Sequence, residues 1–100
     1  MPRKTDRISY LKEVELEFAS GKRSARISDI SIGGCYIDTI AQVPVDEPLS
    51  LHISSSNGES VQFNGRVAYV LENFGFGVEF VDLSDQQRNF LNSIINSATS

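Results

Sequence analysis

The sequence predicts a small all-β protein, a six-stranded antiparallel β-barrel with a C-terminal α-helix and a flexible basic N-terminal arm. Apolar and polar residues alternate with a period of two in several short segments of residues 10–82, as in half-buried strands. The period becomes helical after Ser84, which forms a capping box with Gln87 and begins a predicted helix over residues 84–96. The 100 residues suffice for one core, and strands of this number best avoid exposed edges by closing into a barrel.

The first two predicted strands form a hairpin that follows the arm. Residues 1–9 show no periodicity, and we expect them to be flexible. From about Tyr10, apolar residues alternate with glutamates, which predicts the first strand. A turn at residues 19–22 leads into a second strand at about residues 23–29.

Alternation predicts four further strands, at residues 35–38, 49–54, 61–69 and 76–80. Asn57-Gly58 accepts the positive φ angles of a tight hairpin between the second and third of these strands. Gly65 indicates a bulge or bend in the following strand. Alternation along that strand directs Tyr69 into the core.

The composition is that of a globular protein without a membrane span. Hydrophobic residues make up 40% of the chain and charged residues 22%, and no apolar run approaches the roughly 18 residues that a membrane helix needs. No apolar stretch follows the basic N-terminus, so a signal peptide is not predicted. A single cysteine, Cys35, excludes an internal disulfide. We therefore expect a cytoplasmic protein with no membrane insertion.

The charges are distributed unevenly. Residues 1–26 contain seven Lys or Arg and four Asp or Glu, whereas residues 27–100 contain two Lys or Arg and nine Asp or Glu. This asymmetry favours a basic arm that meets one specific anion over a surface that binds DNA or RNA. A solvated, unstructured N-terminus is the alternative explanation.

The residue constellations of enzymes are absent from the sequence. His52 is the only histidine, and alternation places it on the exposed face of its strand. Cys35 has no other candidate base, so we interpret it as a semi-buried structural thiol. Neither a zinc-spaced Cys/His cluster nor a Walker-type phosphate loop is present. We expect no catalytic residue, metal or cofactor, and hence no enzyme.

Two short polar segments carry the functional signal: residues 3–7 (RKTDR) and residues 29–34 (DISIGG). The planar fork of arginine binds phosphate or the O6/N7 edge of a purine, and it stacks on a base. An aspartate accepts from the adjacent N1–H and N2–H₂ donors of guanine. A basic arm facing an acidic, glycine-rich segment therefore indicates a guanine nucleotide that carries several phosphates.

These segments resemble the RxxxR and (D/N)xSxxG signatures of the PilZ family. Arg3 and Arg7 fill the first, and Asp29, Ser31 and Gly34 fill the second. The strand order, the GRVAYV and FGVEF stretches and the final helix also resemble a PilZ domain, so the likeness covers nearly the whole chain.

The resemblance implies a bacterial receptor for cyclic di-GMP in which the arm wraps the ligand against the barrel. The implied ligand-binding residues are Arg3, Arg7, Asp29, Ser31 and Gly34. Lys4, Gly33 and Tyr69 are secondary candidates; a solvated Lys4 and a core Tyr69 are the alternatives. Pro2 stands where many members carry a further basic or bulky residue, which leaves the number of bound nucleotides open.

We therefore expect a receptor or adaptor whose arm orders when cyclic di-GMP binds and which signals to a partner protein. The alternative is a PilZ-like interaction module that does not bind nucleotide. The intact set of five signature residues favours the receptor, on the premise that the stability of a barrel does not require them. A single-strand nucleic-acid barrel is disfavoured, because most aromatic residues fall on the inward register of their strands.

Overall fold

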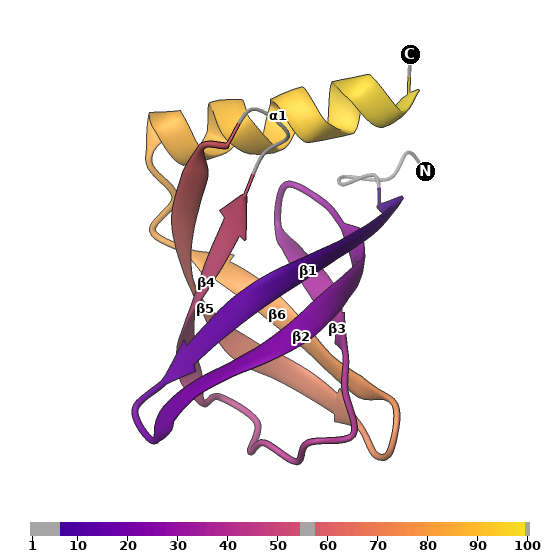
Figure 1. Ribbon diagram of the computed structural model, residues 1–100, viewed down its shortest axis with the longest axis vertical. Coiled ribbons are helices and arrows are strands. Elements are labelled where there is room, and N and C mark those ends of the chain that lie inside the picture. Colours follow the sequence, from indigo (N-terminus) through magenta and orange to yellow (C-terminus); the bar gives the residue numbers. More distant parts are fainter. Residues whose placement is uncertain (1–6, 55–57, 100) are drawn as a thin grey trace.

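The protein is a closed antiparallel β-barrel with one helix across an end (Figure 1). The computed structural model describes residues 7–54 and 58–99. The strands are β1 (Ile8–Phe18), β2 (Gly21–Ile30), β3 (Gly34–Asp38), β4 (Pro48–Ser54), β5 (Ser60–Leu71) and β6 (Gly75–Val81), followed by α1 (Asp85–Thr99). Around the barrel they lie in the order β1-β2-β3-β6-β5-β4. The predicted fold class is confirmed.

Alternation fills the barrel interior from all six strands. Fully buried side chains include Leu16, Ile27, Ile30, Ile37, Leu51, Ile53, Phe63 and Phe76. Phe63 stacks on Phe80 with ring centroids 5.1 Å apart. Burying each such side chain contributes about 1.5–3 kcal/mol to folding, so the apolar interior is the main source of stability.

The helix closes one mouth of the barrel. Its N-terminus is the predicted capping box: Gln87 N donates to Ser84 Oγ at 3.1 Å, and Ser84 N donates to Gln87 Oε1 at 2.7 Å. The helix residue Leu91 is fully buried, and Phe90 packs on Phe63 with ring centroids 5.9 Å apart. Within the described ranges, no helix has the length and hydropathy required to traverse a bilayer.

The start of the barrel and the end of the helix differ from their predicted bounds. The arm was predicted to reach residue 9, but β1 begins at Ile8, because Ile8 pairs with Ile30 and Ser9 pairs with Asp29. The helix continues past residue 96 to Thr99. Residues 1–6 and the predicted turn residue Asn57 lie outside the described residues.

Two features of β5 differ from expectation. Of the bulge or bend expected at Gly65, the bulge is absent, since Gly65 pairs in register with Leu49 on β4 and Phe80 on β6. The register with β6 shifts instead between Val67 and Tyr69. Because an extra residue reverses the direction of the side chains that follow it, Tyr69 lies on the outer face and is 42% exposed.

The barrel is closed by a short seam. β1 pairs with β2 from Ile8 to Phe18, but among the described residues it pairs with β4 only through Glu15, Leu16 and Glu17. Above this seam, toward α1, β1 and β4 diverge (Figure 1).

Candidate functional site

The turn between β2 and β3 is held by the side chain of Ser31. Ser31 N donates to Gly34 O at 2.8 Å, and Ser31 Oγ donates to the same oxygen at 3.3 Å. Gly33 N donates to Ser31 Oγ at 3.2 Å. Ser31 is only 3% exposed, so its hydroxyl is enclosed within the turn and satisfied there.

Gly34 is required by the contact between β3 and β6. A Cβ atom at this position would lie 2.0 Å from the Val78 carbonyl oxygen. The turn is also fastened to β6 by a hydrogen bond from Phe80 N to Gly33 O at 2.9 Å. The premise that barrel stability does not require the signature residues is therefore wrong for Gly34 and, through the turn, for Ser31.

Asp29 and Arg7 lie beside this turn and contact each other. Asp29 is on β2, opposite Ser9 of β1 and Tyr36 of β3. Its Oδ1 atom accepts a hydrogen bond from Arg7 Nη1, and the two groups form an ion pair. The Arg7 and Asp29 side chains are 41% and 35% exposed, so both charged groups are accessible to solvent. Arg3 and Lys4 lie outside the described residues.

A pair of tyrosines continues the site across the barrel surface. Tyr36 on β3 and Tyr69 on β5 both pair with Gly77 on β6, which lies between them. The two rings stack with centroids 6.3 Å apart and an interplanar angle of 29°. A Cβ on Gly77 would lie 2.4 Å from the Tyr69 ring, so the rings meet because this residue has no side chain.

Asp29, Tyr36, Gly77 and Tyr69 thus form one row across four strands. The pKa of Tyr36 is raised by burial and then by the nearby Asp38, Tyr69 and Asp29. The row presents a carboxylate beside aromatic rings, and Arg7 adds a guanidinium. Such a set can accept hydrogen bonds from a base, stack on its face and neutralise a phosphate.

Tyr36 was not among the residues predicted for the site. Asp29 and Tyr36 flank the turn, which signals that they face each other across the hairpin. The register shift between Ile27 and Asp29 lies farther from the turn, so counting outward from the turn pairs Asp29 with Tyr36.

Cys35 lies under this row as a structural thiol. It is fully buried, deeper than the semi-buried position predicted. Burial, reinforced by Asp29 and opposed by Arg7, raises the pKa of the Cys35 thiol to about 12. A thiol with this pKa remains protonated near neutral pH and is a poor nucleophile.

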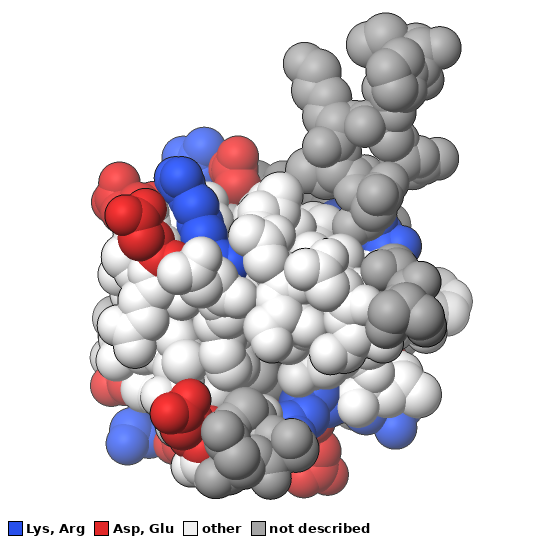
Figure 2. All heavy atoms as spheres, turned by 90° about the horizontal axis from the view of Figure 1, so that it is seen from above, with Lys and Arg blue, Asp and Glu red and all other residues white. Residues whose placement is uncertain are grey.

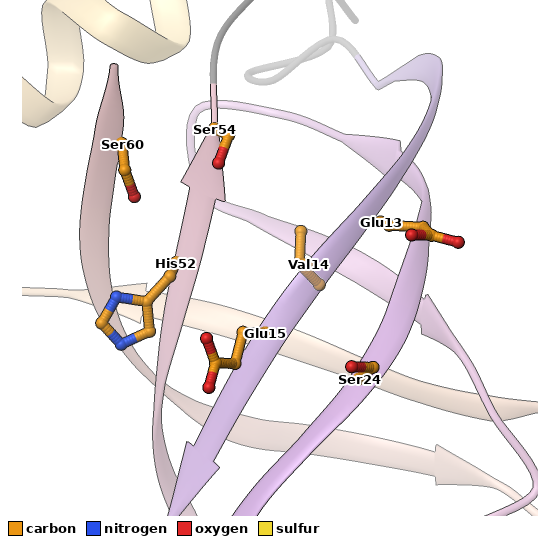
Figure 3. A pocket seen from close by; sticks show the side chains of 7 residues that line it. All are labelled: Glu13, Val14, Glu15, Ser24, His52, Ser54 and Ser60. Carbon is orange, nitrogen blue, oxygen red and sulfur yellow. The ribbon is translucent and has the colours of Figure 1, made fainter. Parts of the chain in front are cut away.

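A separate pocket between β1, β4 and β5 is a poor site for an anion (Figure 3). It has a volume of about 320 Å³, and the described residues that line it include Glu13, Glu15 and His52 but no Lys or Arg. His52 Nε2 also lies 3.4 Å from Glu17 Oε1, which adds a third carboxylate nearby. Among the described residues, no group of three His, Cys, Asp or Glu side chains is arranged to hold a metal.

The helix end of the molecule offers no broad basic surface in the part that the structure describes. Seen from this end, Lys, Arg, Asp and Glu side chains lie at the margin, and the centre is uncharged (Figure 2). Asp85 and Arg88 are the only charged residues in the sequence of α1. Extended binding of nucleic acid needs many phosphate contacts, for which the described residues of this face supply too few cations.

Comparison with solved structures identifies the fold. The PilZ domain of YcgR from Escherichia coli, solved with c-di-GMP, has a TM-score of 0.81 at 16% identity, with 98% of this chain and 92% of that one covered. The PilZ domain of CeSA from a cellulose-synthesizing bacterium has a TM-score of 0.71 at 20% identity, covering 92% and 96%. The MrkH–c-di-GMP complex of K. pneumoniae has a TM-score of 0.77 at 16% identity, covering 97% and 52%.

At these identities, the likeness establishes the fold alone. No similar sequence was found among curated proteins. The sequence profile of the PilZ domain, however, matches residues 2–97, nearly the entire chain. The resemblance drawn from the two signatures is thereby confirmed: this chain belongs to the PilZ domain family.

Proposed function

We propose that this chain is a non-enzymatic receptor for cyclic di-GMP that acts as an adaptor. The observation that carries the proposal is the juxtaposition of Arg7 and Asp29 next to an exposed pair of tyrosines. Two solved structures with this fold, YcgR and MrkH, contain c-di-GMP. The chemistry of the row matches the same ligand, which has two guanine bases and two phosphates.

Each group has a distinct role in the proposed complex. Asp29 accepts from the N1–H and N2–H₂ donors of one guanine, and the Tyr36–Tyr69 pair stacks against a base. Arg7 exchanges its contact with Asp29 for a phosphate or a guanine edge. Neither charge is left unpaired by the exchange, because each receives a new partner from the ligand.

The arm and the turn complete the site. Arg3 supplies the second guanidinium and Lys4 further positive charge, so the arm orders over the bound ligand and presents a new surface to a partner protein. Ser31, Gly33 and Gly34 hold the turn that positions Asp29. The Ser31 hydroxyl reaches the ligand only if its hydrogen bonds within the turn are exchanged. We expect this to occur in the cytoplasm, where the second messenger is made.

Calorimetric titration with cyclic di-GMP tests the proposal. Arg7→Ala and Asp29→Ala each remove a charge-assisted hydrogen bond, so we expect affinity to fall by about tenfold to a hundredfold. The matched control is Arg66→Ala: Arg66 pairs with Glu79 at 3.0 Å on the same outer surface, with a comparable side-chain exposure of 53%. This variant should bind like the native chain.

Selectivity provides a second arm of the same test. Cyclic di-AMP carries the same phosphates but lacks the adjacent N1–H and N2–H₂ donors from which Asp29 is proposed to accept hydrogen bonds. It should bind far more weakly. Equal affinity of the native chain and the Asp29→Ala variant for cyclic di-GMP would sink the proposal.

A PilZ module that docks to proteins without binding nucleotide is the second candidate. The structural roles of Ser31 and Gly34 favour it, since these residues are explained without a ligand. This candidate predicts that neither nucleotide gives binding heat. Asp29 and Arg7 favour the receptor, because the barrel interior does not need them.

A further inference from the structure

The end of the barrel opposite α1 carries an exposed apolar cluster. Among the described residues, six large hydrophobic side chains are strongly exposed, and four of them lie at this end: Ile40 (83%), Val45 (54%), Leu71 (50%) and Phe74 (72%). Ile40 and Val45 belong to the β3–β4 loop, whereas Leu71 and Phe74 flank the β5–β6 turn (Figure 1). We call these four residues the distal apolar cluster.

Backbone hydrogen bonds fix the loop and the turn to the barrel and to each other. Thr39 N donates to Phe74 O at 3.3 Å, and Phe74 N donates to Leu71 O at 2.9 Å. Farther along the loop, Asp46 N donates to Val67 O at 2.7 Å. A pocket of about 240 Å³ lies between residues 41–43 and 70–73. The loop and the turn therefore form a defined surface, and a hollow lined in part by Leu71 lies beside the exposed side chains.

The surroundings of the cluster are acidic. Residues 39–47 and 67–75 contain three carboxylates, Asp46, Glu47 and Glu72, and no lysine or arginine; the bordering arginines, Arg26 and Arg66, are paired with Asp38 and Glu79. An apolar centre with a charged rim is the usual anatomy of a protein-binding surface. Apolar side chains of a partner would gain burial at the centre, and cationic ones would be attracted to the rim.

We propose that the distal apolar cluster docks a segment of a partner protein in which apolar side chains are interspersed with Lys or Arg. A second copy of this chain is disfavoured, because a twofold interface would oppose acidic rim to acidic rim. An anionic membrane surface or a nucleic acid would likewise be repelled. The inference extends the adaptor role proposed above, at a surface that borders the Tyr36–Tyr69 pair but lacks Arg7 and Asp29, and it does not require nucleotide.

The test is an NMR titration of the nucleotide-free protein with two synthetic peptides. One is an amphipathic peptide of Leu and Lys, and the other has Glu in place of each Lys. The Leu–Lys peptide should perturb amides of residues 39–47 and 70–75, and the Leu–Glu peptide should not. The double variant Ile40→Ser/Phe74→Ser should bind the Leu–Lys peptide about tenfold more weakly or worse.

Matched variants distinguish binding at the cluster from nonspecific hydrophobic binding and from an effect of net charge. Leu11 is 68% exposed on β1, so Leu11→Ser removes a similar apolar side chain far from the cluster and should leave affinity unchanged. Glu72→Lys should weaken binding, whereas Glu13→Lys on β1 makes the same change in net charge and should weaken it less.

Several outcomes would overturn the proposal. They are absence of binding, perturbation of a different face, equal binding of the Leu–Glu peptide, or native affinity of the double variant. Dimerisation that Phe74→Ser abolishes would assign the surface to a second copy instead. Because no nucleotide is present, failure here leaves the cyclic di-GMP titration unaffected, and a chain that does not bind cyclic di-GMP can still pass.

Discussion

Tyr69 emerges on the outer face of β5 directly after the register shift, and its ring meets Tyr36 over Gly77. The contact fixes the orientation of both rings before any ligand arrives. A preformed aromatic surface loses little conformational entropy on binding. If the proposed receptor stacks a guanine here, the ring matters and the phenolic hydroxyl does not.

Tyr69→Ala should therefore weaken cyclic di-GMP binding by about tenfold, since stacking of one base contributes roughly 1–3 kcal/mol. Tyr69→Phe keeps the ring and should retain native affinity. Calorimetry on the two variants checks this, and their thermal unfolding shows whether the fold is intact. Native affinity of Tyr69→Ala would exclude stacking on this residue.

The β2–β3 turn is the element on which the barrel and the candidate site both depend. Its serine closes the turn, and its last glycine allows β3 to approach β6. Asp29, immediately before the turn, inherits its position from these contacts. A substitution in the turn thus affects stability first and any ligand second.

Gly34→Ala should destabilise the ligand-free protein by about 3 kcal/mol or more, because the new methyl group overlaps a backbone carbonyl that cannot rotate away. Ser31→Ala removes the hydroxyl from the turn and should lower the free energy of unfolding by about 1–2 kcal/mol. Ser60→Ala, an exposed control, should change it by less than about 0.5 kcal/mol. Thermal and urea unfolding measure all three, and a native Tm for Gly34→Ala would refute the steric role.

Elements with strong periodicity were predictable from the sequence. The positions at which the strands depart from regular alternation were not. The alternation along β1 and the capping box at Ser84 are local patterns, and both were found where predicted. The bulge before Tyr69 and the overlap at Gly34 depend on β6, a strand that pairs with them only after the chain has folded. The contact of Arg7 with Asp29 could be inferred because each belongs to a recognisable signature, whereas Tyr36 belongs to neither.

The whole molecule should lose stability in alkaline solution because of Cys35. In the folded protein the thiol keeps its proton up to a pKa of about 12, whereas in the unfolded chain it ionises near its ordinary value. Between these two values the folded state binds more protons, so the free energy of unfolding falls as pH rises, by at most about 1.4 kcal/mol per pH unit. The contribution is fully present below the unfolded pKa.

Urea unfolding at several pH values between about 8 and 9 measures this slope before most tyrosine side chains of the unfolded chain ionise. Cys35→Ala should flatten the slope, even though the cavity it leaves lowers stability at every pH. Burial also raises the pKa of Tyr10, which steepens the decline at higher pH. An unchanged slope in the variant would show that the thiol is not the group responsible.

The short seam between β1 and β4 has a consequence for motion. In the part of the chain that the structure describes, three residue pairs join these strands, all in the half of β1 away from Arg7. Breathing of the barrel should begin where β1 and β4 diverge, while the β1–β2 hairpin stays intact and carries Arg7 and Asp29 together. We therefore expect the barrel to open locally between β1 and β4, with its proposed ligand contacts, Arg7 and Asp29, moving together on the β1–β2 hairpin.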